Sequence, residues 1–171
     1  MTRRLLLAAL AVLLAATGPA LALPRASTAT TPIATLERRP ETRLVMEAFM
    51  PNITKHPAYP RFSGMSLKQL QERDPRITDQ ALERIDAALA AAQAPPSVGT
   101  TPLFLLAGSP STRAVLDSYF PGLMAHPNYP KFRFLSLKEL QGFDPRITDA
   151  MLAATQSGLD AAAAAEDERA K

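Results

Sequence analysis

The chain has 171 residues, of which 19 are basic and 16 acidic, and it contains neither cysteine nor tryptophan. Outside Arg3 and Arg4 the balance is 17 basic to 16 acidic residues, which excludes the strongly basic surface of a nucleic-acid-binding protein and a polybasic membrane patch. The absence of cysteine excludes disulfides and a cysteine-linked lipid anchor.

The first 22 residues have the pattern of a signal peptide. Arg3 and Arg4 precede an apolar run of 12 residues at 5–16, and Ala-Leu-Ala at 20–22 is a small-x-small cleavage site. The alternative is an uncleaved anchor, but this run is too short to span a bilayer. We therefore expect a periplasmic or secreted bacterial protein with no stable membrane insertion after cleavage. Residues 23–30 are rich in Ala and Thr and are expected to be disordered.

The rest of the chain contains an internal repeat. Residues 30–89 align without a gap on residues 100–159 at an offset of 70, and 27 of these 60 positions are identical. Such a period indicates one structural unit built twice. The predicted organisation is unit 1 at 31–93, a Pro/Gly linker at 94–100, unit 2 at 101–163 and a charged tail at 164–171.

Each unit is predicted to begin with two helices. Thr31 followed by Pro32 is a typical N-cap and first helical residue, and predicts a helix of one to two turns that ends near Arg38. A second helix should begin at Pro40 and stop before Pro51, because proline removes a backbone donor. The counterparts 70 residues later predict the same pair in unit 2.

A proline-rich bend follows at residues 55–62. We predict extended backbone at His56 and Ala58, and an ordered bend because Tyr59 and Phe62 supply apolar anchors. A capping box at Ser66 should then start a short helix.

The longest helix of each unit should be the last. Thr78 and Thr148 are its predicted N-caps. No segment alternates with period two, so the predicted class is all-α: two tandem copies of a short multi-helix unit with Pro-rich bends. A unit of this size is marginally stable alone, and we expect the copies to pack as a pseudo-symmetric pair related by a pseudo-two-fold axis.

The only histidines, His56 and His126, lie at equivalent positions. With Tyr59 and Tyr129 they are candidates for binding a small ligand, a saccharide or a metal. No metal site is predicted, because each unit supplies one histidine and no cysteine. The alternative for the histidines is structural, with the ring hydrogen-bonded to the bend, and for the tyrosines core packing.

A charged cluster follows in each copy, with Asp74, Arg76 and Asp79 in the first. Paired carboxylates can perform acid/base catalysis, but helix capping and an Arg–Asp ion pair explain the same residues. The chain also lacks a nucleophile elbow and a glycine-rich phosphate loop. No catalytic residue and no cofactor are predicted.

Copy two gains aromatic residues where copy one has an alanine, a glycine and an arginine. They are Phe104, Phe134 and Phe143. Apolar residues gathered on a surface mark contact sites, so these three are the candidates for binding a partner protein. The alternative is that they pack against copy one.

The motifs His-Pro-x-Tyr-x-x-Phe, Ser-Leu-Lys-x-Leu-Gln and Ile-Thr-Asp-x-x-Leu occur in both copies. This pattern resembles a small helical accessory repeat at the ends of exported bacterial hydrolases, including esterases and glycoside hydrolases, and covers 31–89 and 101–159. The resemblance implies an accessory role beside a separate catalytic domain. This chain has two such units and no hydrolase domain.

Together these patterns predict an exported, non-enzymatic protein-interaction module or accessory subunit of an envelope enzyme or complex, whose protein partner the sequence does not identify. The alternative is a small-ligand, saccharide or metal binder that uses the two His-Pro-x-Tyr-Pro bends. A third possibility, an enzyme, requires a cleft that joins a histidine to the acidic residues.

Overall fold

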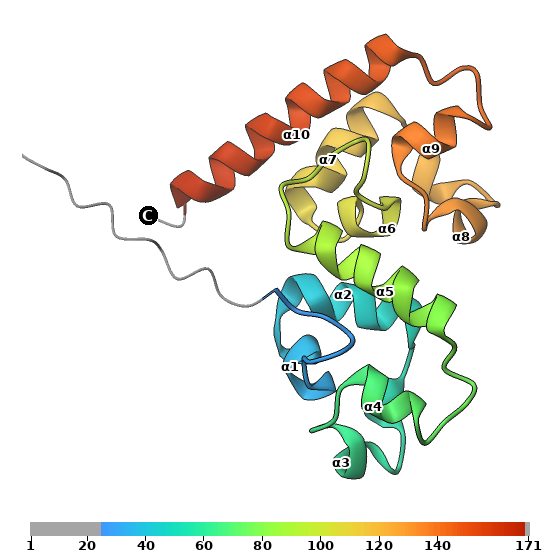
Figure 1. The fold of residues 1–171 in the computed structure, drawn as a ribbon. Coiled ribbons are helices and arrows are strands. Elements are labelled where there is room, and N and C mark those ends of the chain that lie inside the picture. Colours follow the sequence, from blue (N-terminus) through green and yellow to red (C-terminus); the bar gives the residue numbers. More distant parts are fainter. Residues whose placement is uncertain (1–24, 170–171) are drawn as a thin grey trace, which may run out of the picture.

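A computed structural model describes residues 25–169 (Figure 1), so the predicted signal peptide lies outside the described residues. The described part consists of ten α-helices and two 3-10 helices and contains no strand, which confirms the all-α class. None of the helices in this part is both long enough and apolar enough to cross a membrane.

The helices of unit 1 are α1 (Ile33–Arg38), α2 (Pro40–Phe49), η1 (Ile53–Lys55), α3 (Tyr59–Phe62), α4 (Leu67–Gln71) and α5 (Asp79–Ala92). Those of unit 2 are α6 (Leu103–Leu106), α7 (Pro110–Tyr119), η2 (Leu123–Ala125), α8 (Tyr129–Phe132), α9 (Leu137–Gln141) and α10 (Asp149–Arg169).

The first helix of each unit starts one residue later than predicted. Pro32 is the N-cap of α1, and the Thr31 hydroxyl oxygen accepts a hydrogen bond from the Ser27 N–H at 2.9 Å rather than capping the helix. Thr101 accepts from Ser97 in the same way, also at 2.9 Å. In each unit the N–H of a serine four residues earlier therefore occupies the threonine hydroxyl in place of a helix N–H.

The proline-rich bend is more helical than predicted. His56 is extended as expected (φ −66°, ψ 131°), but Ala58 is not (φ −87°, ψ 5°), and Tyr59–Phe62 forms the single turn α3. Pro60 fits the start of this turn, where a helix needs no N–H donor.

The caps predicted for the later helices of each unit are present. The Ser66 hydroxyl oxygen accepts from the Gln69 N–H at 3.3 Å, and Gln69 Oε1 accepts from the Ser66 N–H at 2.9 Å. Ser136 and Glu139 form the same capping box in unit 2. Thr78 caps α5 by accepting from the Ala81 N–H at 3.2 Å.

Residues 25–30 are ordered, which corrects this part of the predicted disorder over 23–30; residues 23–24 lie outside the described residues. Both the backbone N–H and the hydroxyl of Thr28 donate to the Asp86 carboxylate at 2.7 Å, and the Ala26 N–H donates to Gln93 Oε1 at 2.7 Å. Thr28 is only 2% exposed. These polar partners on α5 hold a segment whose composition alone has too few apolar residues to order it.

The predicted linker at 94–100 also packs on its unit. The Val98 N–H donates to Gln156 Oε1 at 3.0 Å, and the Val98 carbonyl accepts from the Lys138 N–H at 2.9 Å. The Thr28 carbonyl accepts from the Lys68 N–H at 3.0 Å in the corresponding way. Residues 97–100 are thus a strap over α9 and α10, and the boundary of unit 2 moves back into the predicted linker.

The predicted charged tail at 164–171 continues α10 as far as Arg169, and residues 170–171 lie outside the described part. Glu166 accepts hydrogen bonds from Ser111 and Ser109 at the start of α7. The tail therefore contacts the start of α7 through Glu166, whereas residues 167–169 are exposed.

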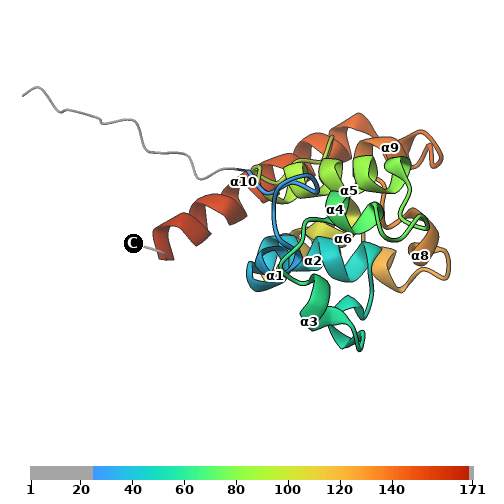
Figure 2. The same ribbon diagram turned by 60° about the horizontal axis from the view of Figure 1, so that its bottom comes forward.

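The units meet between α2 of unit 1 and α6 of unit 2 (Figures 1 and 2). Phe49 packs edge-on to Phe104, with ring centroids 6.1 Å apart, and against Phe134 at 5.1 Å. A pseudo-two-fold axis would repeat the α2–α6 contact as an equivalent contact between α7 and α1. Within the described residues, α7 and α1 make no contact of similar extent, and Tyr119, the counterpart of Phe49, is 39% exposed, so the contact described here does not show the expected pseudo-two-fold.

Gly108 lies close to α2 at this contact. A Cβ atom on Gly108 would lie 2.5 Å from Leu44 Cδ1, so a larger residue here would require the Leu44 side chain to move. The equivalent position in unit 1 is Arg38, which is exposed.

Candidate functional site

Each unit has a surface pocket at its proline-rich bend. The unit 1 pocket has a volume of about 370 Å³ and the unit 2 pocket about 450 Å³. Seven lining residues are identical at the 70-residue offset. In unit 1 they are Pro51, His56, Phe62, Leu70, Asp74, Arg76 and Ile77. In unit 2 they are Pro121, His126, Phe132, Leu140, Asp144, Arg146 and Ile147.

A reversal of the chain opens each pocket. After α2 ends, Asn52 takes the left-handed conformation (φ 66°), and Gly122 does so after α7 (φ 81°). Both residue types tolerate this region, which most side chains avoid. The reversal lets η1 and η2 run back along the mouth of the pocket and present the histidine that follows.

The histidine ring has one nitrogen used by the bend and one that is not. His56 Nδ1 accepts from the Ala58 N–H, and His126 Nδ1 from the Asn128 N–H, each at 3.1 Å. Nδ1 is therefore unprotonated in this arrangement and the proton of the neutral ring is on Nε2. Within residues 25–169, Nε2 of neither histidine makes a hydrogen bond. The predicted structural role is present, and a donor remains at the pocket.

Opposite the histidine, an Arg–Asp pair forms the second polar group. Asp74 Oδ1 accepts from the Arg76 N–H at 3.1 Å and from Nε at 2.8 Å, and Oδ2 accepts from Nη2 at 2.7 Å. In unit 2 the distances are 3.1, 2.9 and 2.7 Å. Both pairs have the bidentate geometry that suits guanidinium and carboxylate.

These hydrogen bonds keep the carboxylates ionised. The arginine side chain and backbone N–H lower the pKa of Asp74 and of Asp144 to about 2. Neither group is then suited to accept a proton as a general base near neutral pH. The side chain of Arg76 is 87% exposed and that of Asp74 30%, so the charge that solvent meets is mainly positive.

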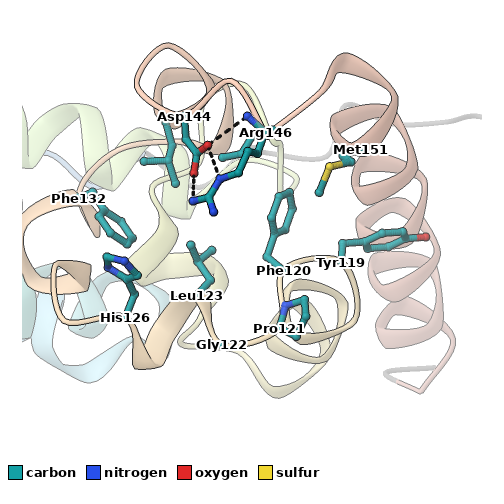
Figure 3. A pocket seen from close by; sticks show the side chains of 12 residues that line it. Tyr119, Phe120, Pro121, Gly122, Leu123, His126, Phe132, Asp144, Arg146 and Met151 are labelled. Atoms are coloured by element: carbon teal, nitrogen blue, oxygen red, sulfur yellow. Dashed lines mark hydrogen bonds and ion pairs between the residues drawn. The ribbon is translucent and has the colours of Figure 1, made fainter.

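Figure 3 shows the unit 2 pocket. The guanidinium of Arg146 points over the pocket toward Leu123, with the Asp144 carboxylate beside it. His126 and Phe132 lie at one end of the view, with ring centroids 5.7 Å apart, and Phe120 lies toward the other. The pocket thus combines an apolar floor with two hydrogen-bond donors at its edge, the guanidinium of Arg146 and the imidazole N–H of His126.

The predicted tyrosines do not line these pockets. Tyr59 packs edge-on to Phe62 with centroids 5.6 Å apart, and Tyr129 packs on Phe132 at 5.7 Å. They support the aromatic wall from behind, so of the four ligand-binding candidates only His56 and His126 border the pockets.

The three phenylalanines predicted to bind a partner fall into two groups in the structure, two between the units and one exposed. Phe104 is 9% exposed and Phe134 is half-buried, and both contact Phe49, with ring centroids 5.6 Å from each other. These two join the units, which corrects their assignment to an external surface. Phe143 is 78% exposed and remains a candidate.

No group of three potential metal-ligating side chains occurs within the described residues. Each pocket brings together one histidine and one aspartate, and that aspartate is already bound by arginine.

The sequence patterns favour caps, turns and core anchors for Asp74, Arg76 and Phe62. Only the enzyme alternative requires a cleft that joins a histidine to the acidic residues, and His56 and Asp74 do line one pocket. That Arg76 and Phe62 share this pocket was not predicted. A signal was present: all four are identical in both copies. An exposed arginine retained in both copies is the most informative of them, because packing does not require it.

No protein-family model, no curated protein and no solved structure matches the chain.

Proposed function

We propose that this chain is an exported, non-enzymatic helical module that binds a protein partner through its two matched pockets, as an accessory subunit of an envelope enzyme or complex. One observation carries the proposal: the exposed Arg76 and His56 recur as Arg146 and His126 around the same apolar floor.

Stability does not account for the retained arginine. Exposed ion pairs contribute little to stability, and Arg76 and Arg146 are 87% and 88% exposed. More than half of the repeat positions have changed between the copies, since 27 of 60 are identical. Recognition of a ligand by both pockets explains why these polar groups remain.

We further propose that the two units share one fold and stack head to tail. In such a heterologous arrangement, unit 1 and unit 2 contact each other through different faces. The face of each unit that contacts no neighbour is exposed to solvent and is expected to be less apolar. Phe104 and Phe134 correspond to Ala34 and Gly64 at the free face of unit 1, which agrees with that pattern. Both pockets then belong to one rigid body, and a partner with two suitable segments gains avidity.

The chemistry of the lining supports binding rather than catalysis. Among the lining residues there is no serine, threonine, cysteine or lysine to act as a nucleophile. The only carboxylates at the pockets, those of Asp74 and Asp144, have their pKa lowered to about 2 by arginine.

A second candidate is a small-ligand binding protein. The pocket volumes of about 370 and 450 Å³ fall within the usual range of small-ligand sites, which is roughly 300–1,000 Å³. Native mass spectrometry of the purified protein separates the candidates: a co-purified small molecule, absent from the pocket variant described next, would favour the second.

The test of the proposed function is a pull-down of exported proteins with matched variants. Arg76→Met with Arg146→Met removes the guanidinium from both pockets. Lys68→Met with Lys138→Met is the control, because these lysines also form exposed ion pairs, with Asp79 and Asp149, and lie outside the pocket lining.

The proposal predicts a partner that the wild type and the lysine control retain and the arginine variant loses. A partner retained equally by all three proteins, or none retained by the wild type, would contradict it. Circular dichroism of each variant confirms that the helices are intact.

A further inference from the structure

We propose that each pocket binds a short peptide element in which a large apolar side chain lies next to a carboxylate, as in Asp-Leu or Glu-Phe. This inference rests on the proposed function and names the chemistry of the partner. It follows from the floor, the edge and the charge of the pockets.

The floor of the pocket selects an apolar side chain. Ile53, Phe62 and Ile77 line it in unit 1, and all three are only partly buried, so apolar surface remains open to solvent. Covering such surface is favourable by about 25 cal/mol per Å². A single leucine or phenylalanine side chain is of a size that a volume of about 370 Å³ accommodates.

The edge of the pocket selects a carboxylate. Asp74 occupies the Nε and Nη2 positions of Arg76, and Nη1 has no hydrogen-bond partner among the described residues. Because Asp74 fixes the guanidinium plane, the free edge is already oriented for a second acceptor. His56 adds an Nε2–H donor at the same pocket, since its Nδ1 is held by the Ala58 N–H.

The charge of the pocket favours a carboxylate over a phosphate. One guanidinium faces the site, and the Asp74 carboxylate already neutralises part of it. Because the Arg76–Asp74 pair is formally neutral overall, a carboxylate with one negative charge is repelled less by Asp74 than a phosphate dianion would be. The occupant we propose is an acidic peptide and not a phosphorylated one.

The unit 2 pocket should accept the larger apolar side chain. Tyr119 and Met151 extend its wall, since their counterparts do not line the unit 1 pocket, and its volume is about 450 Å³. The unit 1 counterpart of Tyr119 is Phe49, which is engaged with Phe104 between the units and does not line a bend pocket.

The test uses fluorescein-labelled peptides of the form Gly-Ser-X-Z-Ser-Gly and anisotropy titration of the full chain. The probes carry Asp-Leu, Asn-Leu, Asp-Ser and phosphoserine-Leu at X-Z. We expect Asp-Leu to bind at two sites, and Asn-Leu, Asp-Ser and phosphoserine-Leu each to bind at least about tenfold more weakly. Arg76→Met with Arg146→Met should abolish the preference for Asp over Asn, and Lys68→Met with Lys138→Met should keep it.

Two histidine substitutions separate binding from folding. His56→Asn with His126→Asn places an amide oxygen where Nδ1 accepts from the bend and removes Nε2. His56→Gln with His126→Gln keeps a polar group near Nε2 and loses the acceptor. We expect the Asn pair to keep the wild-type melting temperature and weaken Asp-Leu binding, and the Gln pair to lower the melting temperature.

Equal binding of Asn-Leu and Asp-Leu, tighter binding of phosphoserine-Leu, or full binding by the arginine variant would overturn the inference. So would failure of all probes to bind while the pull-down still shows a partner that depends on Arg76 and Arg146. In that last case the proposed function would still hold and only the peptide inference would fail. If the pull-down shows no arginine-dependent partner, both the proposed function and the inference fail.

Discussion

Arg76 donates to Asp74 through its backbone N–H, Nε and Nη2, and yet its side chain is 87% exposed. The pair fixes the orientation of the guanidinium more than it stabilises the fold, because an exposed ion pair gains little over hydration. The same geometry at Arg146 and Asp144 indicates that orientation is what both copies keep.

The lowered pKa values predict how acid acts on the protein. A carboxyl whose pKa is lower in the folded state stabilises that state above its unfolded pKa near 4, and the contribution is lost as pH falls through the folded value. For Asp74 and Asp144 the folded value is about 2, so the loss should occur between about pH 4 and pH 2. Urea unfolding at pH 2, 3, 4 and 6 measures it.

The matched variant is Asp74→Asn with Asp144→Asn, which should unfold with a shallower dependence on pH across that window. Some dependence should remain, because hydrogen bonds from Lys68 and Gln141 also lower the pKa of Asp79 and Asp149, respectively. An unchanged slope in the Asn variant would show that the Arg–Asp pairs do not persist in solution.

At the scale of the helix, local signals in the sequence predicted several helix starts and caps correctly, but not the role of Thr31 or the turn at Tyr59–Phe62. Pro40 and Pro110 start helices, and Ser66 and Ser136 form capping boxes as predicted. The straps at 25–30 and 97–100 were missed because their partners, such as Asp86, lie 58 residues away in the sequence. The repeated Ser-x-x-Thr-Thr-Pro at 27–32 and 97–102 was the available clue.

The capping boxes predict a stability effect. Ser66→Ala and Ser136→Ala each remove a side-chain acceptor from a helix N–H at a position 3% and 1% exposed, respectively. Each should lower the free energy of unfolding by about 1–2 kcal/mol, measured by urea denaturation.

Ser157→Ala is the control for the caps. Ser157 is exposed on α10 and its hydroxyl donates to the Ala153 carbonyl at 3.2 Å, a bond that α10 does not need. This substitution should change the free energy of unfolding by less than about 0.5 kcal/mol. Equal effects at Ser66, Ser136 and Ser157 would mean that the caps do not carry the stability assigned to them.

At the scale of the whole molecule, the sequence predicted two helical units but not which faces meet. The gain of aromatic residues in copy two correctly marked a contact, and the alternative of packing against copy one holds for Phe104 and Phe134. Single-sequence patterns do not give the order in which faces pair, because that depends on the fit of Gly108 against Leu44 and of three rings together.

The contact between units predicts a contrast among the phenylalanines. Phe104→Ala should lower the free energy of unfolding by about 3 kcal/mol, because it leaves a cavity beside Phe49 and Phe134. Phe143→Ser should change it by less than about 0.5 kcal/mol, since Phe143 is 78% exposed. A large loss for Phe143→Ser, or none for Phe104→Ala, would contradict the arrangement of the units.

The pockets themselves could be predicted only in part. The sequence showed that the two histidines are a duplicated pair. Each histidine lies in one pocket with Asp74 or Asp144 after a left-handed residue, Asn52 or Gly122, reverses the chain. No local sequence pattern predicted that left-handed conformation. Retention of an exposed arginine in both copies is the feature that would have pointed there.

The most direct test of the central claim is an NMR cross-saturation experiment between the deuterated, isotope-labelled chain and the unlabelled partner recovered in the pull-down. If the partner binds at both pockets, amide signals around them, including those of His56, Arg76, His126 and Arg146, lose intensity when the partner is saturated. Signals on the exposed side of α5, such as Glu83, should not. Intensity loss centred on Phe143, with both pockets unaffected, would contradict the account.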